Sequence, residues 1–204
     1  MAAAGKVLTG FSKPYVALYS ESSGTISYST GQVLARGVSV AVAPDAPGDD
    51  NIFYADNQAA EKVSGRFEGG TVTLTVDGLF AAAEKLIYGL PTATAVTVGT
   101  GTVDTYKYGD TAVAPDCGAG WIERYMSDGT TYYVARALRK IKFQPRSNNA
   151  NTQGEDIEWQ TTELTANIMR DDSADHEWQW FSADLTSEDA AENALKVYLG
   201  IALS

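Results

Sequence analysis

The chain has 204 residues, of which 44% are hydrophobic and 10% aromatic, enough to bury one substantial core. Its formal net charge of −11 repels a phosphate backbone and argues against sequence-specific recognition of DNA or RNA through a basic patch. A single cysteine, Cys117, excludes an intrachain disulfide and a cysteine-cluster metal site, and is typical of a protein made in the cytoplasm.

The chain shows no segment suited to secretion or membrane insertion. Its N-terminal residues lack the apolar run of a signal peptide. The longest apolar stretch, residues 79–90, is interrupted by Glu84 and Lys85 and is too short to cross a bilayer. We therefore expect a soluble protein that does not insert into a membrane.

Short runs of alternating or β-branched residues dominate the chain and predict strands. The expected strands cover residues 15–19, 25–29, 32–42, 71–76, 93–98, 118–126, 131–143, 156–162 and 163–169. Turn-forming residues at 23–24, 69–70 and 127–129 separate several of these runs. The pattern indicates a mainly antiparallel β architecture.

Two segments have helical periodicity. In the first, Asp77 is the expected N-cap, apolar residues recur at helical spacing up to Leu90, and Gly89 lies near the end. The second is expected to begin at Thr186, with Asp189 in the reciprocal position of a capping box. Each apolar stripe is expected to pack on the sheet, so the predicted class is mainly β (α+β minor) with one or two flanking helices.

Two polar segments are longer than ordinary hairpin loops. Residues 43–51 are rich in turn formers and acids, and residues 144–154 form a polar stretch between two expected strands. Loops of this kind usually serve an interface or stay mobile. We expect an interface role for the second loop and leave both readings open for the first.

Charge separates into two blocks near Gly154. Residues 130–154 contain five basic residues and no acid, whereas residues 155–192 contain twelve acids and one basic residue, Arg170. Adjacent blocks of opposite charge suit a protein that docks on copies of itself.

Residues that would indicate catalysis or metal binding are scarce. The one histidine, His176, excludes a multi-histidine metal site and lies in an acidic segment typical of a solvated turn. The aspartates at 45–50 and 171–175 lack the full spacing of a calcium loop, and residues 99–102 lack the ending of a phosphate-binding loop. We expect neither an enzyme nor a cofactor.

Several short motifs follow one another in a particular order along the chain. They are FYADN (53–57), a strand leading into a helix (71–89), GWIER (120–124), DG (128–129), YY (132–133), KIKFQP (140–145) and TQGEDIEWQ (152–160). This order resembles that of the major tail tube proteins of long-tailed phages. The resemblance covers roughly residues 10–200 and does not extend to the segments 97–110 and 171–180. Each motif is weak alone, and their order and spacing carry the resemblance.

The resemblance implies a β-sandwich or barrel-like fold with a flanking helix, shared with type VI secretion tube proteins. It implies one domain over residues 1–204 with a short N-terminal arm (1–12). It further implies that six copies close into a ring and that rings stack into a tube for genome ejection. The implied partners are further copies, the tail tip or baseplate and tape measure proteins, with DNA passing through, and the implied location is the virion after synthesis in the host cytoplasm.

The charge blocks suggest a docking surface. An open sheet exposes unpaired edges, which a cyclic oligomer can pair between subunits. We hypothesise that a basic face, with residues of the adjoining loop, meets acids from residues 155–192 of an adjacent subunit or ring, which would fix orientation. The candidate interface residues are Arg136, Arg139, Lys140, Lys142, Arg146, Asn149 and Thr152. Pairing within one subunit, or simple solvation, is the competing interpretation.

Strand alternation suggests residues that line the tube, because a bore that is neutral or acidic lets DNA slide. The candidates oppose apolar neighbours on their expected strands: Asp156, Glu158, Gln160, Thr73 and Thr75. Either polar face could instead form the exterior. The alternative function is a monomeric carbohydrate-binding or adhesin-like β-sandwich with stacking aromatics at Trp121, Trp159, Trp178 and Trp180.

Overall fold

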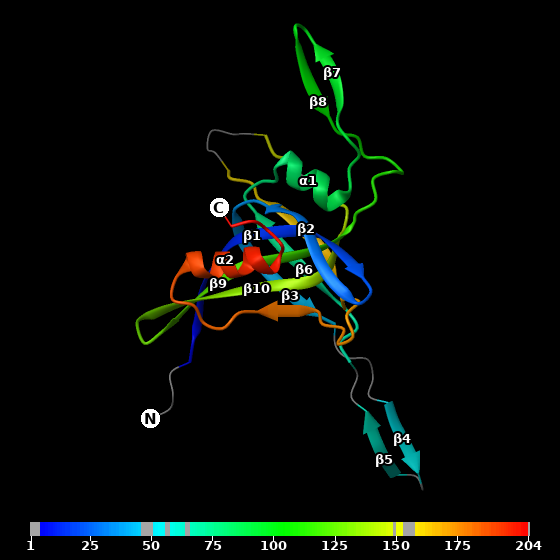
Figure 1. The fold of residues 1–204 in the computed structure, drawn as a ribbon, viewed down its shortest axis with the longest axis vertical. Helices are drawn as coiled ribbons and strands as arrows, with labels where there is room; N and C mark the ends of the chain where they lie inside the picture. The colour runs from blue at the N-terminus through cyan, green and yellow to red at the C-terminus, as the bar shows by residue number, and fades with distance from the viewer. Residues whose placement is uncertain are drawn as a thin grey trace.

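The computed structural model describes residues 5–45, 51–55, 58–63, 66–148, 150–152 and 158–203 (Figure 1). The helices are α1 (Ala81–Tyr88) and α2 (Glu188–Tyr198). The strands are β1 (Val7–Ser22), β2 (Thr25–Val33), β3 (Gly37–Pro44), β4 (Asn51–Ala55), β5 (Gln58–Val63), β6 (Gly70–Val76), β7 (Thr94–Val98), β8 (Gly101–Thr105), β9 (Asp116–Ser127), β10 (Thr130–Phe143), β11 (Thr162–Met169) and β12 (Gln179–Phe181). The mainly β class expected from the sequence is confirmed.

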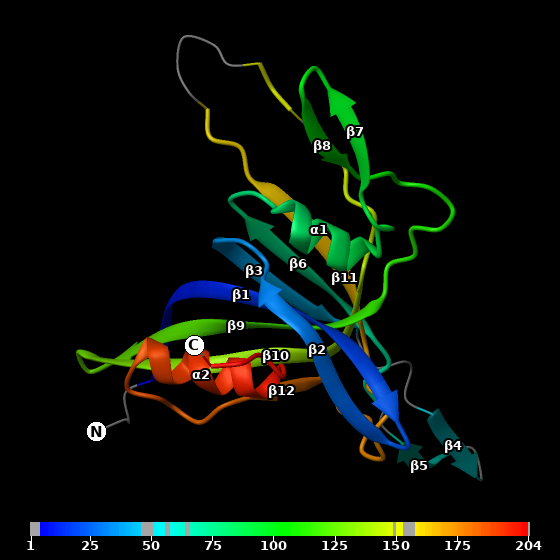
Figure 2. The same cartoon turned by 45° about the horizontal axis from the view of Figure 1, so that its top comes forward.

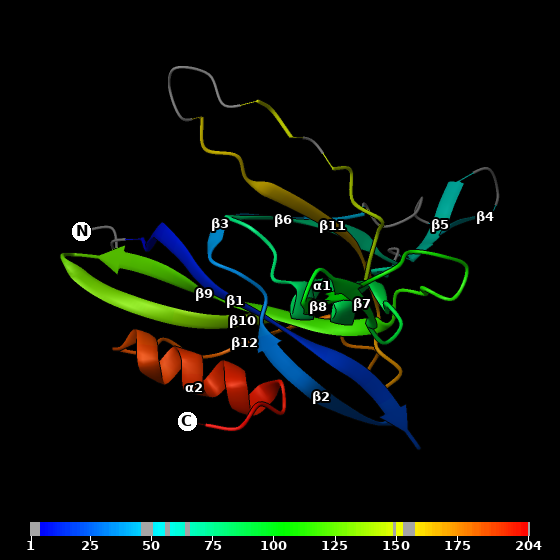
Figure 3. The ribbon, with the colours of Figure 1, turned by 90° about the horizontal axis from the view of Figure 1, so that it is seen from above.

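One antiparallel sheet has the strand order β2-β1-β9-β10-β11-β6-β3. Strand β10 has two successive partners along one side, because β12 pairs with residues 136–138 and β11 pairs with residues 140–143. Beyond that point β11, β6 and β3 cross over β1, β9 and β10 as a second layer (Figure 2). The sheet therefore folds over itself, and the layer of β1, β9 and β10 is covered on its other face by α2 (Figure 3).

Side chains alternate between two cores along the central strands. The larger core lies between the two layers of the sheet and is closed by α1; it contains Trp121, Leu138 and Leu164, each no more than 1% exposed. The smaller core lies under α2 and contains Ile122 and Leu195. Since neighbouring residues of a strand point to opposite faces, Trp121 and Ile122 reach different cores.

Helix α2 packs closely because glycine lies beneath it. A Cβ atom on Gly120 would be 2.4 Å from Leu195 Cδ1 and 2.8 Å from the Arg136 carbonyl oxygen. The helix begins one residue later than predicted, because Ser187, and not Thr186, is the N-cap and accepts a hydrogen bond from the Ala190 amide. The expected helix and its buried stripe are otherwise confirmed.

Helix α1 differs from the prediction at its start. The N-cap is Phe80, without a side-chain capping bond, so the prediction of Asp77 as the cap is wrong. Asp77 instead accepts hydrogen bonds from the Arg36 amide (3.0 Å) and from Arg36 Nε (2.5 Å). The helix ends as predicted at Gly89, whose φ of 60° is the left-handed conformation that glycine favours.

The strand predictions hold for most of the sheet and fail where tertiary contacts interrupt a pattern. The expected strand at 32–42 is divided, because the chain turns inward at buried Leu34, whose amide donates to the Pro14 carbonyl (2.9 Å). Of the expected strand at 156–162, residues 158–161 are not in a strand, and 156–157 lie outside the described residues. Residues 7–12, expected within an arm, form the first part of β1 and pair with β9.

Candidate assembly surfaces

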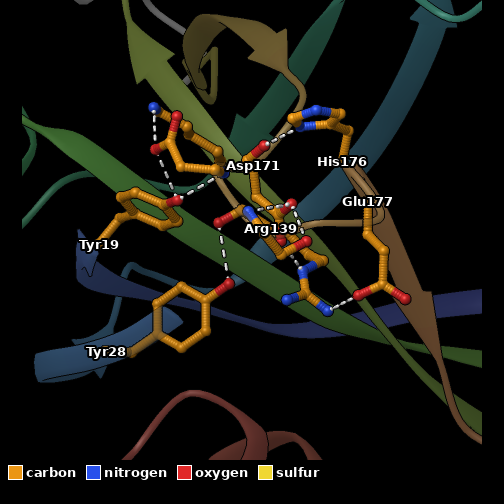
Figure 4. Close-up of polar contacts among 9 residues, drawn as sticks. Tyr19, Tyr28, Arg139, Asp171, His176 and Glu177 are labelled. Atoms are coloured by element: carbon orange, nitrogen blue, oxygen red, sulfur yellow. Dashed lines mark hydrogen bonds and ion pairs between the residues drawn. The ribbon is translucent and has the colours of Figure 1, made fainter. Parts of the chain in front are cut away.

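The two charge blocks meet within one chain at Arg139 (Figure 4). Arg139 Nε lies 2.6 Å from Asp171 Oδ2, and its guanidinium also pairs with Glu177. The Asp171 side chain is fully buried and accepts hydrogen bonds from the amide and the hydroxyl of Ser173. The Tyr28 hydroxyl donates to the Arg139 carbonyl (2.9 Å). This network fixes the turn after β11 against β10.

Lys140 also pairs with acids of its own chain. Its Nζ lies 2.6 Å from Asp172 Oδ2 and 3.6 Å from Asp116 Oδ2, and it stands over the ring of Tyr19. Partial burial disfavours the ammonium, but the hydrogen bond and charge of Asp172 outweigh that effect and raise the pKa of Lys140. For Arg139 and Lys140, the acids of residues 155–192 are therefore partners within the chain.

Arg136 and Arg146 pair with acids outside that block. Arg136 Nε is 2.9 Å from Oε1 of Glu123, which is 8% exposed and also accepts from the Trp121 indole (3.1 Å). Arg146 Nη2 is 2.9 Å from Oε1 of Glu84 on α1, an oxygen that also accepts from the Tyr108 hydroxyl (2.7 Å). Four of the five basic residues thus pair with acids of their own chain.

The remaining interface candidates differ in their surroundings. Lys142 is exposed on β10 and has no ion-pair partner in the part of the chain that the structure describes. Thr152 is also exposed. Asn149 lies outside the described residues. Of the predicted basic face, Lys142 is the cation that is exposed and unpaired among the described residues.

The lumen candidates on β6 form part of a polar sheet face. Thr73 and Thr75 oppose the buried Val72, Leu74 and Val76, as predicted, and are half-buried. Their cross-strand neighbours on β11 and β3 continue the face with Thr165, Glu163, Ala41 and Ser39.

The second group of lumen candidates has a different environment. Glu158 and Gln160 are exposed, but the alternation used to orient them does not apply, since they are not in a strand. The Gln160 side chain forms two hydrogen bonds of 3.2 Å with the backbone of Asn151 and so bridges the two arms of the loop. Asp156 lies outside the described residues.

Two hairpins project from the main sheet (Figure 1). In the β7–β8 hairpin, Val96 pairs directly with Val103, and the exposed fractions are 42% for Val96, 61% for Val98 and 52% for Val103. The predicted strands include residues 93–98 but not β8, although the alternation of threonine and valine around Gly99 is a hairpin signal. Strands β4, β5 and β12 were also missed.

The tryptophans do not form a shared platform. Trp121 is buried, Trp178 stacks on Phe67 with ring centroids 4.4 Å apart, and Trp180 stacks on Tyr198 at 4.2 Å. Trp159 is different, with 88% of its surface exposed. Because three of the four are held by neighbours within the chain, the aromatic platform of the carbohydrate-binding alternative receives no support from their arrangement.

Features typical of catalytic or metal centres are scarce in the described residues. Histidine, cysteine and acidic side chains do not gather there in groups of three or more that could hold a metal ion. Burial raises the pKa of Cys117 to about 12, which leaves its thiol protonated at neutral pH. In the same part of the chain, neither helix is long and apolar enough to span a bilayer.

No family model matches the chain, and no curated protein matches it at a significant level.

Proposed function

We propose that this chain is a structural subunit that assembles into rings, and that the rings stack into the tail tube of a long-tailed phage. The observation that carries the proposal is the open sheet: β2 and β3 are its end strands and have no further strand partner among the described residues. The motif resemblance supplies the six-fold ring, the virion location and the passage of DNA.

Unpaired strand edges favour self-association. Each edge presents backbone donors and acceptors that another chain can satisfy, and a soluble protein normally shields them. Here β2 and β3 lie at opposite ends of one strand order, so pairing β2 of one copy with β3 of the next joins two different surfaces. A contact between different surfaces forms a ring when its rotation closes. A β2–β3 contact would therefore give a cyclic assembly, whereas β2–β2 or β3–β3 pairing would give a two-fold dimer.

The polar face carrying Thr73 and Thr75 is our candidate for the tube wall. Its residues on β3, β6 and β11 are neutral or acidic, and on β10 the face continues with a cation, Lys142, which lies opposite Asn167. A wall with few cations holds DNA only weakly by counterion release. Replacing both threonines with lysine should preserve rings and slow genome ejection, whereas replacing both with serine should change neither. Normal ejection by the lysine variant would show that this face lies elsewhere.

Electron microscopy tests the assembly. Negative-stain images of the purified chain at high concentration, with rotational averaging, should show rings or tubes with closed symmetry. Dispersed monomers that bind a glycan would overturn the proposal in favour of a carbohydrate-binding module.

Substitution of Lys142 tests whether an exposed cation of the basic block contributes to the contact between copies. Lys142→Glu should shorten or abolish the polymers, because Lys142 is exposed and without an ion-pair partner among the described residues, and Lys142→Arg should leave them intact. Lys140 is unsuitable for this test, since its substitution would also break the contact with Asp172. Tubes of normal length from Lys142→Glu would remove Lys142 from the interface.

A further inference from the structure

A groove on the main body is lined by apolar side chains and is open to solvent. It has a volume of about 610 Å³ and lies between α1, the end of β2 and residues 106–115. Its lining includes Leu18, Leu86, Leu90, Tyr106 and Pro115. Leu86 and Leu90 are buried, so the floor is fixed, and the volume falls within the range of about 300–1,000 Å³ typical of binding pockets.

The chain also carries an unpartnered side chain of the kind that fills such grooves. Trp159 is 88% exposed, the largest exposed fraction among the large hydrophobic residues described. Tryptophan is enriched among interface residues that dominate binding energy, because it buries about 150–250 Å² of surface. Residues 158–161, which contain it, have no strand or helix of their own.

The groove and Trp159 lie on different sides of the same subunit. The segment that leads into β11 projects away from β2 in both Figure 2 and Figure 3. The groove adjoins β2, so a tryptophan on a segment that projects away from β2 is suited to reach the groove of a different copy.

The two features also lie at the same end of the sheet. Thr162 at the start of β11 and Gly37 at the start of β3 both pair with Val76. The start of β3 is separated by only three residues from the end of β2, where Thr30 and Gln32 line the groove. Copies related by rotation about one axis can therefore bring the two together without a shift along that axis.

We propose that Trp159 of one copy occupies the groove between α1 and β2 of the next copy. This contact rests on the proposed ring assembly, and it would set the direction in which the copies follow one another around the ring. The Gln32 side-chain amide donates to the Ala82 carbonyl (3.2 Å), which leaves its oxygen able to accept from the indole N–H. Lys85 lines the groove, and the segment that carries Trp159 contains Glu158, so the charges are complementary.

Variants on both sides of the contact test it. Trp159→Ala should raise the concentration needed for polymer formation, measured by sedimentation, by about tenfold or more, while Trp159→Phe should have a smaller effect. Ala82→Glu places a carboxylate at the groove; Ala82 is exposed in the first turn of α1, where an acid suits the helix dipole, so the fold should be kept. This variant should also raise the concentration tenfold or more. Phe181→Ala, at another exposed aromatic residue, is the control and should assemble normally.

Crosslinking tests the contact directly. A mixture of the Glu158→Cys and Lys85→Cys variants should form a covalent dimer with a short bismaleimide, and neither variant alone should; buried Cys117 provides the background. Polymers that form normally with Trp159→Ala, or a mixture that does not crosslink, would overturn the contact while leaving the ring assembly in place. A wild-type chain that stays monomeric at every concentration would overturn both.

Discussion

The main sheet and the projecting segments of this protein are stabilised in different ways. In the folded sheet, Trp121, Leu138 and Leu164 are at most 1% exposed, and two cores lie on opposite faces of the central strands. In the β7–β8 hairpin and the segment around Trp159, apolar side chains of the same types face solvent. Burial within the chain accounts for the sheet and not for the projections, as expected if other copies cover them in the proposed assembly.

The largest difference between these regions should appear on removal of a tryptophan. Trp121→Ala creates a cavity in the larger core and should lower the free energy of unfolding by about 3–5 kcal/mol. Trp159→Ala removes a side chain that is 88% exposed and should change that energy by less than about 0.5 kcal/mol. Urea titration of both monomers measures the two values. Equal losses would mean that Trp159 packs against its own chain.

The two acids that follow β11 provide a smaller contrast. Asp171→Ala leaves the half-buried guanidinium of Arg139 without its fully buried partner and should cost about 3 kcal/mol. Asp172→Ala removes a carboxylate whose side chain is 48% exposed, so its loss should cost less than about 1 kcal/mol. Thermal unfolding of both variants checks the order. If Asp172→Ala costs as much as Asp171→Ala, the charge blocks act as one network.

A pH dependence should arise where α2 is anchored. Burial disfavours ionisation of Glu192, but hydrogen bonds from Lys13, Lys196 and Tyr15 outweigh it and lower its pKa to about 2. Because this pKa is lowered by folding, the stabilisation is complete above the pKa of about 4.5 of the unfolded chain and is lost as the pH falls towards 2.

Between pH 5 and pH 2, protonation of Glu192 should lower the free energy of unfolding by on the order of 2 kcal/mol. This loss adds to any loss from the protonation of other acids. Glu192→Gln should be less stable than the wild type at pH 7 and should lose less stability on acidification. Urea titrations at pH 7, 5 and 3 check both points. A variant with the same pH profile as the wild type would show that Glu192 does not contribute.

The sequence predicted the sheet well where one face of a strand is buried. The alternation in residues 71–76 and 163–169 corresponds to β6 and β11 because apolar and polar residues there do meet different surroundings. It failed at 32–42, where a backbone contact to Pro14 divides one apolar run, and at 158–161, where alternation occurs without a sheet. The side of a strand on which a partner lies is a tertiary fact that a local pattern does not contain.

The candidate surfaces were predicted less completely. The charge blocks are a real feature of the sequence, but whether they meet within the chain depends on the turn that brings Asp171 back to Arg139. Arg139 and Lys142 lie three residues apart on one strand, and the local sequence does not predict that Arg139 pairs within the chain while Lys142 stays exposed. The exposure of the tryptophans could not be predicted from the local pattern either, since the exposed Trp159 and the buried Trp121 both lie in runs that were predicted to be strands.

The β7–β8 hairpin should have the smallest effect on the isolated subunit. An isolated two-stranded hairpin is at best marginally stable in water, and the described side chains of this one are exposed except for the half-buried Thr105. Replacing residues 94–105 with a glycine-serine linker should therefore change the free energy of unfolding by less than about 0.5 kcal/mol, as measured in urea.

Assembly of the same variant should change strongly. If the exposed Val96, Val98 and Val103 contact another copy, removal of the hairpin should abolish rings or tubes in negative stain while the monomer remains folded. A triple Val→Thr variant keeps the strand propensity and removes apolar surface. It therefore tests whether assembly needs the valine side chains themselves or only the presence of the hairpin. Full assembly by the linker variant would limit the docking surfaces to the sheet edges and the segment around Trp159.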